Sequence, residues 1–349
     1  MNSSNILYTE HTVRDGIQVL DREIHKFVCI VNKNNILKGT FTQGDMRRYL
    51  LNNGDISAPI TKAMNPAPRI FSSRTDALEA AKKERLAVYP IVDNTGTLID
   101  YYLSGLPTYD VMEKKPLKEI PLVIMAGGKG TRLYPYTKVL PKALIPIGDL
   151  TISERIIQKF ANWGCRDVYL ILNYKGGMIK SYYEELNKDY NIHFIKEDEF
   201  LVTGGGLSLL KGLIHSTFIL SNCDILVDAD YDCMLKIHRS QHNLITFVAA
   251  MKDVVIPYGI LSTTPDGQIK NIHEKPEMSF LTSTGIYLIE PDIINELNEG
   301  EFIHITDIAQ RYLDKNEKIG AFPISGKSWL DMGQFEEMNV MLKELGIDE

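Results

Sequence analysis

Short apolar runs bounded by polar turns alternate with amphipathic stretches along most of the chain. The apolar runs predict β-strands at residues 27–32, 36–42, 89–93, 98–103, 122–126, 167–173 and 218–224. Apolar residues at helical spacing predict helices at 44–51, 77–85 and 177–186, and a further helix opens at Thr151-Ile-Ser-Glu154, which has the form of a capping box. From residue 120 onwards strands and helices alternate. The pattern therefore predicts an α/β fold with a Rossmann-like, mixed but mostly parallel sheet and helices on both faces.

The residues before this sheet show an internal repeat. A strand, a polar turn, a second strand and a flanking helix occur twice, with the turns at 34–35 and 94–96. This spacing indicates a module duplicated about 60 residues apart. Glycine, proline and charged residues interrupt the pattern at 104–120. We therefore expect a small α+β module ahead of the larger sheet.

A glycine-rich loop follows the predicted strand at 122–126. Its glycines are Gly127, Gly128 and Gly130. Glycine lets the backbone come close to a ligand, so its N–H groups can point at phosphate oxygens. Arg132 and Lys142 add two cations. The loop has neither the Gly-Lys-Ser/Thr ending of a P-loop nor the G-x-G-x-x-G spacing of a dinucleotide site, so it predicts another kind of polyphosphate site.

Two aspartates are candidate ligands of Mg²⁺, which prefers oxygen donors and takes one or two protein carboxylates. Asp224 ends the apolar run at 218–224, and Asp331 lies in Trp329-Leu-Asp-Met-Gly333. An aspartate at a strand end is also a common helix N-cap, so Asp224 alone leaves both readings open. The acidic residues that follow it are expected to serve as turn and capping residues; they are Asp228, Asp230 and Asp232.

No transition-metal site is expected. The four cysteines are scattered without C-x-x-C spacing and read as small apolar side chains. His238 and His242 are four residues apart on a predicted helix, but the sequence offers no third ligand. We expect both histidines on a solvated helix face.

Composition limits the function classes. The chain has 349 residues, which allows two or three domains. Its net charge of -7 argues against a nucleic-acid surface. No run approaches the roughly 20 apolar residues that a membrane span requires. With free cysteines, these features predict a soluble cytoplasmic protein that binds neither nucleic acid nor membrane.

The string from Gly127 to Pro146 resembles the signature of sugar-phosphate nucleotidyltransferases. That signature runs G-G-x-G-T-R-L-x-P-x-T-x-x-x-P-K-x-L-x-P, and the chain matches every specified position. The resemblance implies a nucleotidyltransferase fold. It also implies a Mg²⁺-dependent transfer of a nucleotidyl group from a nucleoside triphosphate to a sugar 1-phosphate, with release of pyrophosphate.

The same resemblance implies roles for individual residues. Catalytic cations would be Arg132, Lys142 and Lys275. Residues next to the nucleotide would be Ala126, Gly127, Gly128, Gly130, Thr131 and Gly205. Residues of the sugar pocket would be Tyr258, Gly259, Glu274, Thr284 and Gly285, with Glu274 and Lys275 in the family's E-K-P segment. Mg²⁺ would be held by Asp224 and Asp331, although the family usually has Gly where Cys223 precedes the first aspartate.

The duplicated module resembles a tandem CBS pair, which in many proteins binds adenine nucleotides. In Gly39-Thr-Phe-Thr-Gln-Gly-Asp45, the resemblance assigns Thr42 to phosphate and Asp45 to ribose. The second repeat lacks this pattern, so we expect at most one nucleotide site. A purely structural or dimer-forming pair is the alternative.

Together these resemblances predict a CBS regulatory module at 1–112, a linker at 113–120 and a nucleotidyltransferase domain at 121–349. The combination is similar to glucosamine-1-phosphate guanylyltransferases of the legionaminic acid pathway, so GTP and glucosamine 1-phosphate are the expected substrates of a homo-oligomer. No residue dictates the base. Mannose-1-phosphate guanylyl, thymidylyl and uridylyl transfer are alternatives, and a catalytically inactive nucleotide sensor is the alternative from another class.

Overall fold

The structure is a computed structural model that describes residues 5–22, 26–81, 86, 88–103 and 115–347. Contacts divide the chain into two compact units. The first consists of Met1–Leu106, Ala249–Thr282 and Pro323–Lys327, and the second of Pro107–Val248, Ser283–Phe322 and Ser328–Glu349. Residues 104–114, where the predicted linker begins, lie outside the described residues.

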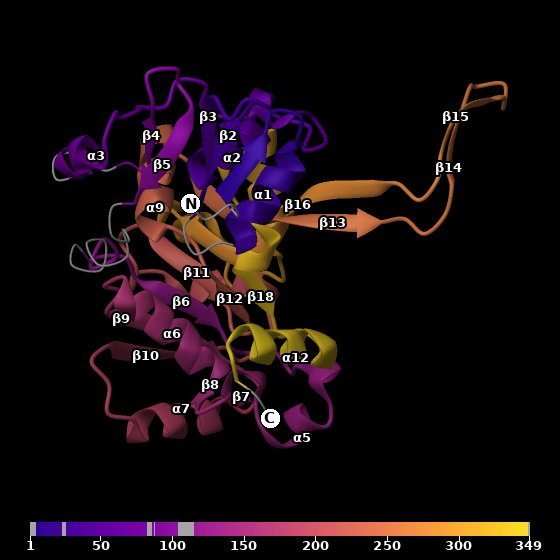
Figure 1. Cartoon of the computed structure of the whole chain (residues 1–349). Helices are drawn as coiled ribbons and strands as arrows, with labels where there is room; N and C mark the ends of the chain where they lie inside the picture. The colour runs from indigo at the N-terminus through magenta and orange to yellow at the C-terminus, as the bar shows by residue number, and fades with distance from the viewer. Residues whose placement is uncertain (1–4, 23–25, 82–85, 87, 104–114, 348–349) are drawn as a thin grey trace. The chain divides into compact units, whose positions relative to one another are not determined.

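The second unit contains most of the central sheet and its helices (Figure 1). Its elements are β6 (Leu122–Met125), η3 (Thr131–Leu133), α5 (Tyr136–Val139), η4 (Lys142–Leu144), β7 (Pro146–Ile147), β8 (Leu150–Thr151), α6 (Ile152–Asn162), β9 (Asp167–Leu172), α7 (Gly176–Glu185), β10 (Asn191–Lys196), α8 (Val202–Gly205), η5 (Gly206–Leu210), β11 (Phe218–Asn222), β12 (Ile225–Val227), α9 (Tyr231–Gln241), α10 (Asp292–Glu296), α11 (Ile305–Asp314), β18 (Trp329–Asp331) and α12 (Phe335–Glu344). Three strands and a short helix extend to or across the border with the first unit: β13 (Ile245–Val255), β16 (Glu277–Ile289), β17 (Ile319–Ile324) and η6 (Gly326–Ser328).

Among the described residues, seven strands form the central sheet in the order β10-β9-β6-β11-β16-β13-β17. The pairs β10–β9, β9–β6 and β6–β11 are parallel, and β11–β16 is antiparallel. This confirms the predicted mixed, mostly parallel sheet. Parallel neighbours end at the same edge, so the loops after β6 and β11 meet there.

Both faces of the sheet are covered. On one face Val123, Leu220 and Ile289 belong to an apolar cluster with residues of η5, α10 and α11. Side chains alternate along a strand, so Leu122 and Ile124 point to the other face, which α6 covers (Figure 1). Thr151 caps α6 by accepting from Glu154 N, which is one of the two hydrogen bonds of the predicted capping box. The side chain of Glu154 accepts from Tyr182 Oη at 2.6 Å instead.

The first unit contains the N-terminal module. Its elements are β1 (Ile6–Tyr8), α1 (Val13–Arg22), β2 (Phe27–Val31), β3 (Leu37–Thr42), α2 (Gln43–Leu51), η2 (Ile60–Lys62), α3 (Arg74–Ala81), β4 (Tyr89–Val92) and β5 (Leu98–Tyr102). Both predicted strand–turn–strand units are present. Their turns exchange hydrogen bonds, since Leu37 N donates to Gly96 O at 3.0 Å and Leu98 N donates to Asn35 O at 2.9 Å. The two repeats therefore pack together reciprocally.

β2 is buried on both sides and joins the two repeats. Val28 and Ile30 pack with α1 and α2. Phe27, Cys29 and Val31 point the other way and pack against β4 and β5. β2 therefore contributes side chains to two apolar clusters of the module, one on each of its faces.

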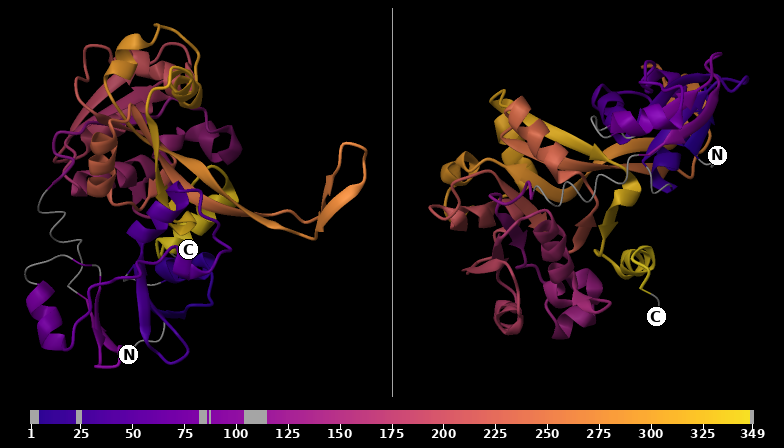
Figure 2. Two further views of the ribbon diagram at one scale, coloured as in Figure 1. Left: turned by 90° about the horizontal axis from the view of Figure 1, so that it is seen from above. Right: turned by 60° about the vertical axis from the view of Figure 1, so that its left-hand side comes forward.

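The first unit also contains a two-stranded ribbon, residues 256–276, between β13 and β16. It is built from β14 (Ile260–Thr263) and β15 (Ile269–His273), which pair antiparallel with Leu261 opposite Ile272. Figure 2 shows the ribbon continuing from β13 and β16. Leu261 and Ile272 remain 54% and 62% exposed.

No helix in the described part of the chain combines the length and the apolar character needed to cross a membrane.

Candidate active site

A cavity of about 280 Å³ lies in the second unit where β6 and β11 end. Three groups of residues line it: the loop after β6, the end of β11, and the segment after β10. They are Met125, Gly127, Gly128, Gly130, Thr131, Arg132, Lys142, Glu197, Phe200, Val202, Thr203, Asn222, Cys223 and Asp224. The cavity therefore brings together the predicted glycine loop, both of its cations and the first predicted metal carboxylate.

The glycine loop owes its path to close contacts. Ala126 N donates to Ile171 O at 2.9 Å, so this amide belongs to the sheet. A Cβ on Gly127 would lie 2.9 Å from Glu197 Oε2. Gly130 has φ of +61°, a left-handed conformation that favours glycine. A larger side chain at Gly127 or Gly130 would therefore displace the loop from the cavity wall.

The side chain of Lys142 packs against the same glycine loop. A Cβ on Gly130 would lie 2.8 Å from Thr137 Cγ2 and 3.1 Å from Lys142 Cβ. Thr137 Oγ1 donates to Gly130 O at 3.0 Å. Ser153 Oγ donates to Ala143 O at 2.7 Å and anchors η4, which carries Lys142. The spacing of glycine, threonine and lysine in the signature thus corresponds to one packed unit.

Asp224 and Asp331 are brought together by the antiparallel pairing of β12 and β18. Ile225 is in register with Asp331, and Met332 N donates to Asp224 O at 2.8 Å. The two carboxylates, far apart in the sequence, therefore lie side by side.

Lys142 Nζ forms an ion pair with Asp224 Oδ2. The two side chains are 11% and 14% exposed, so each charge depends on the other in a poorly solvated place. Burial raises the pKa of Asp331, and the carboxylates of Asp224 and Glu337 raise it further. The N–H of Gly333, 2.7 Å from Asp331 Oδ1, and the charge of Lys142 act in the opposite direction.

Gly333 has no side chain, and this leaves room for the charged side chains of three neighbouring residues. A Cβ there would lie 3.1 Å from both Asp331 Oδ1 and Glu337 Oε2, and 3.4 Å from Arg132 Nη1. Among the described residues, Glu337 Oε2 is buried without a hydrogen-bond partner, and Arg132 is exposed without an ion-pair partner. Arg132 is therefore free to bind an anion.

The residues present fit Mg²⁺. Within the described residues, no group of three or more His, Cys, Asp or Glu side chains is arranged to hold a metal ion. Mg²⁺ does not need such a cage, because it is bound through one or two carboxylates and completes its shell with water and substrate phosphates. Asp224 and Asp331 offer that pair of hard oxygen donors.

Glu197 is a cavity residue that sequence analysis missed. It is 3% exposed, and its Oε1 accepts from Leu201 N at 3.1 Å. Its Oε2 has no hydrogen-bond partner in the described part of the chain. Burial raises its pKa, and the Leu201 N–H partly offsets this. The available signal was its position at the carboxyl end of β10, within a charged run that resembles an ordinary loop.

Three other predicted residues lie near the cavity without lining it. Gly205 is buried, and a Cβ there would lie 2.0 Å from Glu301 O, so close packing already requires glycine. Thr284 is buried and donates to Val248 O at 2.9 Å. Gly285, with φ of +89°, leaves room for Asn222, which does line the cavity.

The remaining predicted residues belong to the first unit, whereas the residues that line the cavity belong to the second. Tyr258, Gly259, Glu274 and Lys275 belong to the ribbon, and Tyr258 is 74% exposed. Their roles stay predictions.

Thr42 and Asp45 form a reciprocal capping box at the start of α2. Asp45 is buried and forms an ion pair with Arg48. These bonds give both residues a structural task, and the nucleotide contact implied by resemblance stays a prediction.

Of the acidic residues after Asp224, Asp230 is a capping residue as predicted, whereas Asp228 and Asp232 form ion pairs. Asp230 is the N-cap of α9 and accepts from Cys233 N at 2.9 Å. Asp232 pairs with Lys236 on the same helix, and the 79% exposed Asp228 pairs with Lys159.

The prediction that His238 lies on a solvated helix face is wrong. His238 is fully buried, with Nδ1 2.8 Å from Thr246 Oγ1 and Nε2 2.8 Å from Glu290 Oε1. His242 is exposed and ends α9 in a left-handed conformation. The helical pattern could not reveal the acidic partner because Glu290 lies 52 residues later.

Replacing His238 with Leu is expected to destabilise the fold by about 1–3 kcal/mol, because Thr246 and Glu290 each lose one buried hydrogen-bond partner. The His238 hydrogen bond holds the pKa of Glu290 below its usual range. This stabilisation is therefore present above the unfolded-state pKa and is lost as the pH falls through the lowered folded-state value. Thermal unfolding over a pH series measures both effects. The matched His242→Asn variant should be neutral, since Asn tolerates the left-handed conformation; equal loss in both variants would contradict the role of His238.

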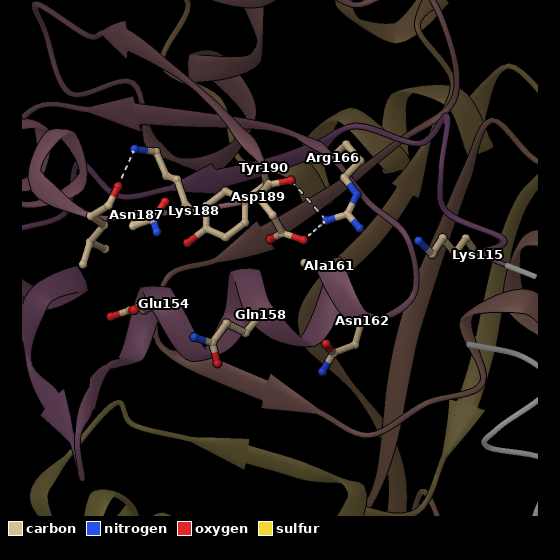
Figure 3. A pocket seen from close by; sticks show the side chains of 11 residues that line it. Lys115, Glu154, Gln158, Ala161, Asn162, Arg166, Asn187, Lys188, Asp189 and Tyr190 are labelled. Carbon is tan, nitrogen blue, oxygen red and sulfur yellow. Dashed lines mark hydrogen bonds and ion pairs between the residues drawn. The ribbon is translucent and has the colours of Figure 1, made fainter. Parts of the chain in front are cut away.

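A second cavity of about 600 Å³ lies beside α6 in the same unit (Figure 3). Arg166 Nη1 donates to Asp189 Oδ2 at 2.6 Å, and Lys188 Nζ donates to Tyr183 O at 2.5 Å. These cations are already satisfied by protein acceptors. None of the predicted site residues lines this cavity, so the smaller cavity is the candidate active site.

Comparisons with known proteins identify the family to which the chain belongs. A profile of the family described as nucleotidyl transferase matches residues 122–345. A mannose-1-phosphate guanyltransferase from Pichia angusta is 30% identical over 222 residues, which are 61% of this chain and 60% of that protein. The bifunctional protein GlmU from Methanococcus maripaludis is 30% identical over 222 residues, 60% of this chain and 51% of that protein. The match thus spans less than two thirds of either relative.

The crystal structure of HddC from Yersinia pseudotuberculosis is similar with a TM-score of 0.51 at 25% identity, covering 65% of this chain and 99% of that one. This similarity confirms the nucleotidyltransferase fold. The matched profile covers more than half of the chain and includes the glycine loop and both carboxylates. The chain therefore belongs to the nucleotidyl transferase family.

Proposed function

We propose that the protein transfers a nucleotidyl group from a nucleoside triphosphate to a hexose 1-phosphate, with GTP and glucosamine 1-phosphate as substrates. The observation that carries the proposal is the convergence of the glycine loop, Lys142 and the carboxylates Asp224 and Asp331 at one edge of the sheet. Membership of the nucleotidyl transferase family supports the same reaction class.

The reaction is an in-line displacement. An oxygen of the sugar 1-phosphate attacks the α-phosphorus, a new P–O bond forms, and the bond to pyrophosphate breaks. Positioning and charge neutralisation drive such transfers, so no protein nucleophile is needed. We assign Arg132 to the leaving pyrophosphate, Lys142 to the α-phosphate and Lys275 to the attacking sugar phosphate.

The glycine loop and the acidic pair complete this assignment. The amides of Gly128, Gly130 and Thr131 can donate to phosphate oxygens, as glycine-rich loops do elsewhere. Asp224 and Asp331 would hold Mg²⁺, which supplies positive charge at the reacting phosphate. The ion pair with Asp224 holds the ammonium of Lys142 beside this acidic pair.

Glu197 supports a guanine base. A carboxylate accepts hydrogen bonds only, and guanine carries the N1–H and N2–H donors side by side on one edge. Glu197 Oε1 is engaged by Leu201 N, whereas Oε2 remains available beside the glycine loop. The guanyltransferase name of one relative points to the same base.

A pyrophosphate-release assay over four triphosphates and several hexose 1-phosphates tests the proposal. The expected result is release with GTP and glucosamine 1-phosphate. Faster turnover of mannose 1-phosphate would support mannose-1-phosphate guanylyl transfer, and preference for dTTP or UTP would overturn the base. Absence of release with every pair would leave the alternative of a nucleotide-sensing regulator.

Replacing Glu197 with Gln is expected to lower kcat/KM for GTP by about tenfold to a hundredfold, the range of a lost hydrogen bond to a charged group. In this variant the side-chain oxygen can still accept from Leu201 N. The negatively charged oxygen that would accept from guanine is replaced by an amide NH₂ group. Steady-state kinetics with GTP, ATP and UTP measure the change in preference. Glu199→Gln, two residues later and exposed, is the matched control; an unchanged GTP preference in Glu197→Gln would contradict the contact.

The N-terminal repeats are proposed to form the regulatory tandem CBS module at 1–112, joined by a linker at 113–120 to the catalytic domain at 121–349. We propose an adenine nucleotide at Thr42 and Asp45, and a homo-oligomeric protein. The sugar pocket would include Tyr258, Glu274 and Thr284. If ATP and AMP neither bind nor alter the rate, the nucleotide site of the module is excluded.

A further inference from the structure

Arg14, near the start of α1, binds both strands that flank the ribbon. Its Nη1 lies 3.0 Å from Asp253 Oδ2 on β13 and 2.9 Å from Glu277 Oε1 on β16. Its Nη2 donates to Ser279 Oγ at 3.2 Å. Arg14 is only 19% exposed, and all four residues belong to the first unit. One side chain of the N-terminal module therefore joins the two strands at the root of the ribbon.

The two carboxylates would repel each other without this arginine. Asp253 Oδ2 and Glu277 Oε1 both lie within hydrogen-bond distance of one nitrogen atom, although they belong to different strands. Like charges on neighbouring strands destabilise their pairing. Arg14 turns this repulsion into a set of charge-assisted hydrogen bonds.

The ribbon pairs with no third strand in the part of the chain that the structure describes. β14 and β15 form a two-stranded sheet, and all residues of β15 are exposed. An isolated two-stranded hairpin is marginally stable in water. The direction in which the ribbon presents its side chains therefore depends on how its root is held.

The helix that carries Arg14 is well anchored. Val13 and Ile17 are buried in an apolar cluster against which Met251 of β13 also packs. At the other end of the helix, Leu20 is buried in the same cluster. The buried face of α1 thus fixes the position of Arg14 in the N-terminal module.

We propose that Arg14 is a positioning residue: it sets the ribbon that carries Tyr258, Glu274 and Lys275, and thereby the affinity for the sugar 1-phosphate. This inference rests on the proposed function, which makes the sugar phosphate the ligand of the ribbon. It also links the N-terminal module to the substrate that the ribbon binds.

Arg14→Met tests the proposal, because methionine keeps much of the apolar stem and removes the charge. Arg22→Met is the matched control, since Arg22 is exposed in the last turn of the same helix and has no ion pair in the described part of the chain. We expect KM for the hexose 1-phosphate to rise about tenfold in Arg14→Met, while KM for the triphosphate stays within about twofold. Arg22→Met should match the wild type.

Two further variants separate positioning from general destabilisation. Arg14→Lys should give an intermediate KM, because one ammonium cannot reproduce the forked contacts of a guanidinium. Adding Asp253→Asn to Arg14→Met should recover part of the affinity by removing one of the repelling charges. Equal increases in both KM values, or no recovery in the double variant at normal thermal stability, would overturn the proposal.

Hydrogen exchange of residues 256–276 provides a readout that does not need turnover. Arg14→Met should speed exchange there, and Arg22→Met should not. Unchanged exchange in the ribbon would overturn the positioning role even if the enzyme is active. Faster exchange in a protein that releases no pyrophosphate with any substrate pair would instead reject the proposed function and leave the anchoring role of Arg14 standing.

Discussion

Asp224→Asn is expected to lower the rate of pyrophosphate release by about 10²–10³-fold, the typical cost of removing one preorganised charge at a reacting centre. The amide keeps the size of the side chain and can still accept from Lys142. It no longer provides an anionic ligand beside Asp331. Turnover at saturating substrates over a Mg²⁺ series measures the loss, and binding of Mn²⁺ to the variant should weaken in parallel.

The protein should remain folded, so the loss can be attributed to the site. Asn leaves the ammonium of Lys142 without its anionic partner in a poorly solvated place, and we expect a stability cost of about 1–3 kcal/mol. Asp228→Asn is the matched control: this residue follows closely in the sequence, is largely exposed and forms a surface ion pair. Surface pairs contribute little, so this control should keep wild-type turnover. More than a tenth of normal activity in Asp224→Asn would exclude the carboxylate from the metal site.

The parts of the site that sequence analysis predicted are those with local causes. Gly130, Thr137 and Lys142 lie within a short stretch, and the structure shows that they pack on one another. A left-handed glycine and its neighbours give a recognisable pattern because the chain itself creates the contact. The fold class was predictable for the same reason, since the apolar strands and amphipathic helices are local patterns.

The parts that were missed depend on contacts between distant residues. Glu197 is buried because the chain folds the end of β10 against the glycine loop, and nothing in its neighbourhood distinguishes it from exposed Glu199. His238 fits an ordinary helical pattern, and its burial follows from Glu290 on another element. The ion contacts of Arg14 connect it to residues of β13 and β16, so no local pattern could predict them.

The neighbourhood of Asp224 and Asp331 is an intermediate case. Each residue was selected by its motif, but their proximity results from the pairing of β12 with β18. The pairing also explains Gly333, whose missing side chain leaves room for Asp331, Glu337 and Arg132. The resemblance to the family identified the two aspartates, and the register between β12 and β18 explains why they lie close together.

Lys142→Met separates the contribution of the lysine charge to turnover from that of the proposed metal ligands, Asp224 and Asp331. Methionine keeps most of the apolar stem that packs against Gly130 and removes the ammonium. We expect turnover to fall by about 10²–10³-fold, because the charge that neutralises the reacting phosphate is lost. Mn²⁺ binding should be retained, since Asp224 and Asp331 are unchanged, in contrast to the result expected for Asp224→Asn.

The combination of the two variants tests whether the pair acts as a unit. Each single change leaves one charge of the Lys142–Asp224 pair unpaired, whereas the double variant removes both. Its loss of stability should therefore be smaller than the sum of the single losses, and its loss of rate should be far from additive. Lys138→Met, an exposed lysine in the same signature segment, is the control and should behave as wild type. Additive losses in both stability and rate would mean that Lys142 and Asp224 act separately, and loss of Mn²⁺ binding in Lys142→Met would mean that the lysine serves the metal site and not the phosphate.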